Sequence, residues 1–219
     1  TDRAVQNNLL TLGAGDDLVN HLGGQNSSGD TIFGGAGDDT VAQTGVGWSF
    51  HFYGGDGIDT ADFSGTTYGT LGMLVDLAAQ TYDYLYVASR TAYGVAFDIQ
   101  DVENVIGSVQ NDDIFGDGAD NLLDGQGGDD LIEGGLGSDT LLGDDGSDTL
   151  SGGDGNDTLS GGAGGDLIYG QSDDDSISGD GGNDTTYGGG GNDTLYGGTG
   201  NDWLLGNADD DSLLGEDGN

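Results

Sequence analysis

Residues 152–170 read GGDGNDTLSGGAGGDLIYG, which is two nine-residue units placed head to tail. Each unit has the form Gly-Gly-x-Gly-x-Asp, followed by a triplet with an apolar residue at its centre. We number the unit so that the Gly residues are positions 1, 2 and 4, the Asp is position 6 and the apolar residue is position 8. Gly permits the left-handed backbone conformations of tight turns, and one inward side chain between two outward ones is the pattern of a short β-strand. The unit therefore predicts a turn followed by a strand.

The same register extends in both directions from this stretch. Stepping by nine from Leu159 gives 13 position-8 residues between Val105 and Leu213, and all of them except Thr186 are apolar. Position 4 departs from Gly near the start of this array, at Gln110 and Ala119. Because a single unit can bury nothing, the pattern predicts stacked units, with two columns of turns and a thin core of position-8 side chains between two parallel sheets.

The composition excludes several classes of partner. The 219 residues include 41 acidic and 2 basic side chains, for a net charge of −39, and only three of the acids are Glu. Such a charge excludes nucleic acid as a natural partner. No apolar run approaches the roughly 20 residues of a membrane span, and the absence of Cys excludes disulfides and Cys-based zinc sites.

The carboxylates recur in register, which has an electrostatic cost. Neighbouring layers lie about 4.8 Å apart, and two unit charges at that distance repel by roughly 3 kcal/mol at an effective dielectric of about 20. A hard divalent cation between successive turns converts this repulsion between carboxylates into a net attraction. Ca²⁺ takes oxygens from carboxylates and backbone carbonyls, and Gly-rich turns with Asp offer both. The spacing therefore predicts a ladder of calcium sites.

The unit resembles the nonapeptide of the RTX (repeats-in-toxin, haemolysin-type) family, GGxGxDxUx. Its complete Gly-Gly-x-Gly-x-Asp core occurs seven times, at 34–39, 54–59, 134–139, 152–157, 161–166, 188–193 and 197–202. The resemblance implies an all-β fold, a right-handed parallel β-roll (β-solenoid) with two units per coil. It also implies Ca²⁺ between each turn and the turn two units on, for about ten ions in the regular array.

The resemblance implies two columns of calcium ligands. One column would be Asp112, Asp130, Asp148, Asp166, Asp184 and Asp202. The other would be Asn121, Asp139, Asp157, Asp175, Asp193 and Asp211. The less regular units of the N-terminal part add Asp17, Asp30, Asp39 and Asp59.

The chain divides into three regions. We expect an irregular roll over 1–62, an interlude without the motif over 63–104, and a regular roll over 105–219 that ends mid-repeat, as a fragment of a longer protein would. Insertions at 21–29 and 43–53 are expected as loops or extra strand segments. The interlude is expected to be β-rich and continuous with the roll.

Aromatic residues concentrate in the 48–97 region, which holds 11 of the 17 in the chain. One interpretation is a small core that packs the irregular segment on the roll; in that case Trp48, Phe50 and Phe52 alternate toward one buried side. The other is an exposed patch that binds a glycan or a protein surface.

Catalytic motifs are absent from the sequence. His21, His51 and Arg90 are the unusual polar groups, and neither HExxH nor GxSxG occurs. We therefore expect no enzymatic activity of the chain itself. The resemblance implies a secreted or cell-surface bacterial module that folds on calcium and accompanies type I secretion. The alternative is a piece of a surface structural protein, such as an adhesin or a surface-layer component, that assembles on calcium.

Overall fold

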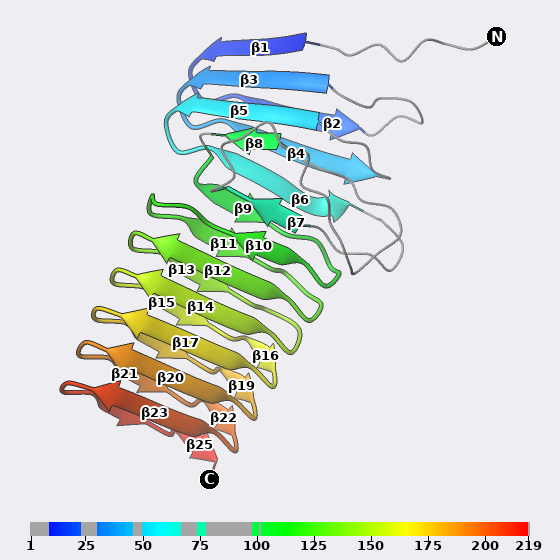
Figure 1. Ribbon diagram of the computed structural model, residues 1–219. Coiled ribbons are helices and arrows are strands. Elements are labelled where there is room, and N and C mark those ends of the chain that lie inside the picture. The colour runs from blue at the N-terminus through cyan, green and yellow to red at the C-terminus, as the bar shows by residue number, and fades with distance from the viewer. Residues whose placement is uncertain are drawn as a thin grey trace.

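A computed structural model describes residues 9–22, 30–45, 50–66, 74–77, 98–100 and 102–218. Within these ranges all regular structure is β-strand, and each pair of neighbouring strands runs parallel. None of the described segments is a helix long and apolar enough to cross a membrane. The strands stack coil upon coil along one axis (Figure 1), which is the parallel β-roll that the sequence predicts.

Two sheets form one face of the roll. The first has the order β1 (Leu9–Ala14), β3 (Asp30–Ala36), β5 (Phe50–Asp56), β8 (Asp98–Gln100). The second has the order β7 (Leu74–Asp76), β10 (Asp113–Phe115), β12 (Leu131–Leu136), β14 (Thr149–Asp154), β17 (Leu167–Ser172), β20 (Thr185–Gly190), β23 (Trp203–Ala208).

The opposite face is one continuous sheet of ten strands. Its order is β2 (Leu18–Leu22), β4 (Thr40–Gly45), β6 (Thr60–Thr66), β9 (Asn104–Ile106), β11 (Leu122–Asp124), β13 (Thr140–Leu142), β15 (Thr158–Ser160), β18 (Ser176–Ser178), β21 (Thr194–Tyr196), β24 (Ser212–Leu214). A narrow four-stranded sheet joins successive turns at one side of the roll: β16 (Ala163–Gly164), β19 (Gly181–Gly182), β22 (Thr199–Gly200), β25 (Asp217–Gly218).

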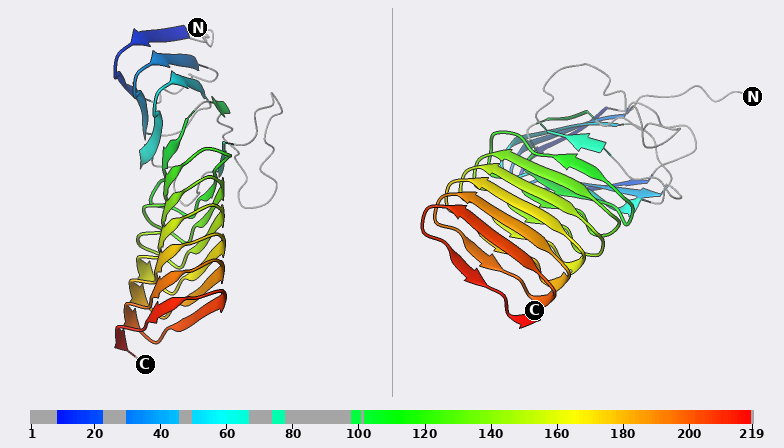
Figure 2. Two further views of the ribbon diagram at one scale, coloured as in Figure 1. Left: turned by 90° about the vertical axis from the view of Figure 1, so that its left-hand side faces the viewer. Right: turned by 60° about the horizontal axis from the view of Figure 1, so that its bottom comes forward.

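The register follows the two-unit coil. Leu150 pairs with Ile168 on one face, and Leu141 pairs with Leu159 on the other, so partners lie 18 residues apart. Each regular coil therefore places one position-8 residue on each face, pointing inward. From Val105 to Leu195 these side chains are at most 1 % exposed, and together they form the predicted core. Figure 2 shows the two faces of the stacked coils from two further directions.

The interlude interrupts only one face. In the ten-stranded sheet, β9 pairs directly with β6, Val105 against Ala61. On the other face, β8 closes the first sheet with Ile99 against Phe52, and β7 opens the second with Val75 against Ile114. Residues 67–73, 78–97 and 101 between these strands lie outside the described residues.

An extra strand segment occupies part of the 43–53 insertion. Residues 50–53 belong to β5, and Phe52 stacks on Ile32 as a fully buried core side chain. Counting by nine misses Phe52, because it follows the core residue Val41 by 11 positions. Residues 23–29 and 46–49 of the two insertions lie outside the described residues.

The aromatic region divides between core and surface where it is described. Phe52 and Phe63 are fully buried, which agrees with the core interpretation. Tyr53 stacks on Phe33 with ring centroids 4.8 Å apart, and Phe33 is 39 % exposed. Trp48 and the side chain of Phe50 lie outside the described residues, as do Tyr68, Tyr82, Tyr84, Tyr86, Tyr93 and Phe97.

Candidate calcium sites

The position-6 side chains form two columns along the roll. The column that precedes the seven-stranded sheet contains Asp112, Asp130, Asp148, Asp166, Asp184 and Asp202. The column that precedes the ten-stranded sheet contains Asp17, Asp39, Asp59, Asn121, Asp139, Asp157, Asp175, Asp193 and Asp211. From Asp39 to Asp193 the members of both columns are at most 4 % exposed, whereas Asp17, Asp202 and Asp211 are half-buried near the ends of the roll.

Asp30 differs from the other expected ligands. It is buried, but it opens β3 and is paired there with Phe50 of β5. The next coil therefore presents an aromatic residue at the level where a second carboxylate was expected. Asp30 belongs to no described column of stacked carboxylates.

Glu103 is a column member that the motif search missed. Glu103 occupies position 6, because it lies two residues before the position-8 core residue Val105. Its Oε2 accepts a hydrogen bond of 2.8 Å from the backbone N–H of Asp59. A nine-residue step back from Asp112 lands on Glu103. The signal was thus present in the sequence, but it was hidden by the change from Asp to Glu.

A hydrogen-bond ladder fixes the carboxylates. In each column the backbone N–H of one position-6 residue donates to Oδ1 of the position-6 Asp in the next coil. Asp130 donates to Asp148 Oδ1 at 2.8 Å, and Asp139 donates to Asp157 Oδ1 at 2.8 Å. One carboxylate oxygen of each Asp is therefore used to align neighbouring coils, and the other remains for a different partner.

That second oxygen is buried and has no hydrogen-bond partner. Within the described residues this holds for Oδ2 of Asp39, Asp59, Asp130, Asp139, Asp148, Asp157, Asp166, Asp175, Asp184 and Asp193. Buried polar atoms in proteins are nearly always paired, and leaving a charged one unpaired costs several kcal/mol. A periodic row of such atoms indicates a partner that is not part of the chain.

The space in front of these oxygens suits a hard cation. Asp148 Oδ2 and the Gly161 carbonyl oxygen each lie 2.5 Å from the point where a Cβ on Gly143 would stand. The same pairing of a carboxylate with the next turn's carbonyl recurs at Gly179, where Asp184 Oδ2 and the Gly197 carbonyl oxygen lie 2.5 and 2.6 Å from that point. Carboxylate and carbonyl oxygens are the ligands that Ca²⁺ takes, and only Gly at position 1 leaves this space open.

Burial makes the anionic form of these side chains costly. It raises the pKa of Asp148 from 3.8 to about 6, and the neighbouring Asp166 charge adds to this. Burial likewise raises the pKa of Asp130 to about 8 and that of Asp175 to about 7, with charges from the adjoining coils contributing in both cases. The backbone N–H that donates to each carboxylate offsets only part of the increase. A cation at the free oxygen would favour the charged form again.

Side chains alone do not make a metal site in the described ranges. No group of three or more His, Cys, Asp or Glu side chains there is placed to hold a metal ion. Backbone carbonyls of the Gly-rich turns and water are the other oxygens that Ca²⁺ takes in proteins.

Asp112 and Asn121 lie in their columns, but their environment differs. Ser108 donates its backbone N–H to Asp112 Oδ2 at 2.7 Å, and Asp117 donates its backbone N–H to Asn121 Oδ1 at 2.9 Å. The oxygens that are unpaired elsewhere are thus already hydrogen-bonded at these two positions.

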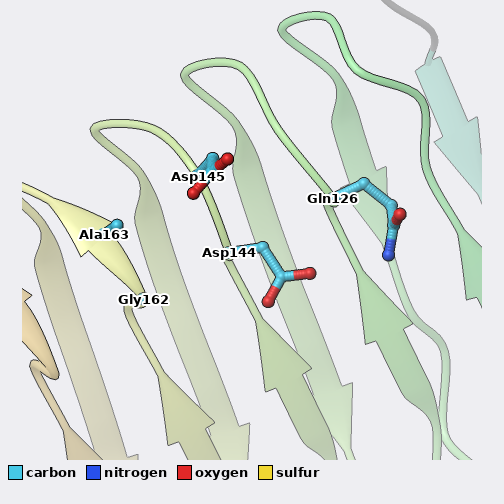
Figure 3. A pocket seen from close by; sticks show the side chains of 5 residues that line it. All are labelled: Gln126, Asp144, Asp145, Gly162 and Ala163. Carbon is cyan, nitrogen blue, oxygen red and sulfur yellow. The ribbon is translucent and has the colours of Figure 1, made fainter.

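A polar recess of about 330 Å³ opens on the outer side of the first turn column, lined by Gln126, Asp144, Asp145, Gly162 and Ala163 (Figure 3). Burial and the nearby Asp124 raise the pKa of Asp144. The lining offers one amide and two carboxylates. The two His residues lie apart from it, His21 on β2 and His51 on β5, in strands of opposite faces.

The family comparison agrees with this geometry. The RTX calcium-binding nonapeptide repeat (4 copies) matches residues 6–28, 26–42, 106–141, 133–168, 142–177, 151–186, 160–195 and 187–219. A search of curated proteins finds no match. The matches cover more than half of the chain and follow the columns of turns described above. The chain therefore belongs to the RTX calcium-binding nonapeptide repeat family.

Proposed function

We propose that this chain is a calcium-folded β-roll module of a secreted or cell-surface bacterial protein and that it has no catalytic activity of its own. The single observation that carries the proposal is the row of ten buried, unpartnered Asp Oδ2 atoms. A chain that buries these carboxylates without a counter-ion is penalised at every coil. A chain that buries them around calcium gains a bond between coils.

Positions 1 and 6 of each turn have different roles in the proposed calcium site. At position 6, Oδ1 accepts the backbone N–H of the preceding coil, as Asp148 Oδ1 does from Asp130, and Oδ2 is left for the cation. Position 1 must be Gly so that the space stays open, and the following turn contributes its own position-1 carbonyl oxygen. Calcium, when bound, supplies the positive charge and accepts the remaining oxygens.

Folding outside the cell follows from the difference between extracellular and cytosolic calcium concentrations. Extracellular calcium modules bind in the range of about 10⁻⁴–10⁻³ M, far above cytosolic free calcium. The chain would stay largely unfolded during export and fold outside, because metal binding and folding are one equilibrium in such a module. RTX repeats are typical of secreted bacterial proteins, which supports this localisation.

Circular dichroism in excess chelator and in calcium tests the proposal. The metal-free chain should be largely disordered and should gain β-signal on adding Ca²⁺. Gly143→Ala, which fills the space beside Asp148 Oδ2, should raise the calcium midpoint several-fold. Gly165→Ala is the matched control, because its Cβ meets nothing closer than the Asn183 carbonyl oxygen at 3.4 Å. A chain fully folded in chelator, or equal midpoints for the two variants, would reject the proposal.

A role in surface assembly is the second candidate. Tyr169 and Tyr187 stack on the outer side of the seven-stranded sheet with ring centroids 5.1 Å apart, and Trp203 on the same sheet is 66 % exposed. Exposed aromatic side chains gathered on one face suit contact with a neighbouring molecule. Sedimentation velocity of the calcium-loaded chain, with Trp203→Ala as the comparison, separates the candidates. Calcium-dependent association that is lost in the variant favours assembly, and a monomer at all concentrations favours the isolated module.

A further inference from the structure

We propose that the coil of residues 107–124 holds no calcium and divides the roll into two separate calcium ladders. This inference rests on the proposed function and concerns two of the expected ligands, Asp112 and Asn121. It differs from the uniform columns of calcium ligands that the nine-residue spacing predicts. The coil comprises the turn GSVQND (107–112), strand β10, the turn GDGADN (116–121) and strand β11.

In the turn 107–112, the carboxylate of Asp112 is satisfied by its own turn. Its Oδ2 accepts the backbone N–H of Ser108 at 2.7 Å, and the Ser108 hydroxyl lies 3.1 Å from each carboxylate oxygen. The backbone N–H of Gln110 in turn donates to the Ser108 hydroxyl at 3.2 Å. One coil further along the same column, Asp130 Oδ2 is buried without a partner.

In the turn 116–121, a neutral amide replaces the carboxylate. Asn121 Oδ1 accepts the backbone N–H of Asp117 at 2.9 Å, and its Nδ2 donates to the Glu103 carbonyl oxygen at 3.2 Å. The backbone N–H of Ala119 donates to Asp117 Oδ1 at 2.9 Å, which closes the turn on itself. A side-chain donor thus links this coil to the previous one, without a cation.

The backbone explains why these two turns differ. In every other described turn that ends at a position-6 Asp, position 2 has a left-handed φ, from 65° at Asp180 to 129° at Gly189. Ser108 and Asp117 are not among the left-handed residues. Their position-4 partners are Gln110 and Ala119, where most turns have Gly. The two turns thus take another backbone path, which directs the position-2 N–H at the side chain of position 6, whereas the non-Gly residues Gln126 and Asp144 keep a left-handed φ at position 2.

An N–H donor competes with a cation for the same oxygen. The amide hydrogen carries partial positive charge and occupies one lone pair of Asp112 Oδ2, so a cation there would face repulsion, and the oxygen no longer needs a cation to be paired. Unpartnered oxygens resume at Asp130 and Asp139 and continue through Asp193, and before the coil they occur at Asp39 and Asp59. The calcium ladder is therefore interrupted between Asp59 and Asp130.

Native mass spectrometry of the full chain in calcium counts the ions and tests the interruption. Asp112→Asn and Asp130→Asn are a matched pair, because both side chains lie in the same column, in consecutive coils, and are at most 3 % exposed. Asp130→Asn should lose at least one ion. Asp112→Asn should keep the wild-type count, since an Asn oxygen still accepts the Ser108 N–H, as Asn121 does from Asp117.

A variant that is expected to gain a calcium site complements this test, because impaired folding cannot add an ion. The double change Ser108→Gly with Gln110→Gly restores the form Gly-Gly-x-Gly-x-Asp at 107–112 and removes the hydroxyl donor. We expect it to bind one more ion than the wild type. A lost ion in Asp112→Asn, or an unchanged count in the double variant, overturns the inference. If Asp130→Asn also keeps the wild-type count, or if the wild type binds no calcium, the proposed function itself fails.

Discussion

Replacing Asp148 by Asn should have opposite effects on stability in the absence and in the presence of calcium. Asp148 is 1 % exposed, its Oδ1 accepts the Asp130 N–H at 2.8 Å, and its Oδ2 has no partner. Asn has the same shape and retains the oxygen that aligns the coils. It removes the charge, and its amide can donate toward the carbonyl oxygen of Gly161 that faces this space.

The magnitude follows from the pKa of the buried carboxyl. Burial, with the Asp166 charge, raises the pKa of Asp148 from 3.8 to about 6. A difference of about 2 in pKa between the folded and unfolded chain corresponds to roughly 3 kcal/mol. Because the folded pKa is raised, the protonated group contributes this stability below pH 3.8, and the contribution is lost as pH rises through about 6. At pH 7.5 in chelator, Asp148→Asn should therefore be more stable than the wild type by up to about 3 kcal/mol.

In calcium the sign reverses, because the variant lacks a charged ligand at one site. Its calcium midpoint should rise several-fold, so the two titration curves cross. In chelator, folding can be driven by trimethylamine N-oxide, which favours burial by exclusion from the protein surface, and followed by circular dichroism at pH 7.5 and 4.5. The stability difference between the wild type and Asp148→Asn should be largest at pH 7.5 and should fall to about a third of that value at pH 4.5, which lies between the unfolded and folded pKa values. A variant less stable than the wild type in chelator at pH 7.5 would refute the reasoning.

Three further changes test other parts of the roll. Asp157→Ala should raise the calcium midpoint more than Asp211→Ala, since Asp157 lies between two coils of its column while Asp211 is half-buried at the last described coil; equal shifts would contradict shared sites. Phe52→Ala should cost about 3–5 kcal/mol, as other large core truncations do, and increase the calcium needed for folding; superimposable titrations would show that Phe52 is not structural. Thr186→Val should stabilise the calcium-loaded roll by about 1–2 kcal/mol in urea unfolding, because the buried Thr186 hydroxyl has no partner. Thr158→Val, on the exposed side of β15, should change little.

The regular array was predictable because each coil repeats one physical solution. A strict period of nine places position 8 inward and position 6 in the turn every time. The pairing of Leu141 with Leu159 and the burial of the position-8 side chains from Val105 to Leu195 follow from that period. Thr186 shows how strongly the register dominates, since a polar side chain is buried there without a partner rather than shifted outward.

The N-terminal part was less predictable because insertions change the count. Two extra residues separate Val41 from Phe52, so a fixed step passes over the core position that β5 provides. The alternation of aromatic residues in 50–53 was the local cue for a strand. Asp30 fails as a column member for a related reason, because the coil next to it places Phe50 at the same level.

The two unusual turns illustrate a different limit. Position-by-position reading identifies Asp112 and Asn121 as ligands because the residue types are right or nearly right. Gln110 and Ala119 were visible as exceptions, but their consequence depends on the backbone path of the whole turn. Only the hydrogen bonds from Ser108 and Asp117 show that the oxygens are already used.

The coil 107–124 has a particular place in the energetics of the roll. Its position-8 residues Ile114 and Leu123 are fully buried, so it contributes to the core like any other coil. Its position-6 side chains are satisfied by hydrogen bonds, so it avoids the penalty that calcium must offset elsewhere. In a stack where each coil contacts mainly its neighbours, stability is a sum over coils and interfaces. Without calcium, folding of this coil therefore costs less free energy than folding of the other coils. The coils from Asp130 onward and those up to Asp59 depend on the ion. The calcium concentration then determines how many coils fold on either side of residues 107–124.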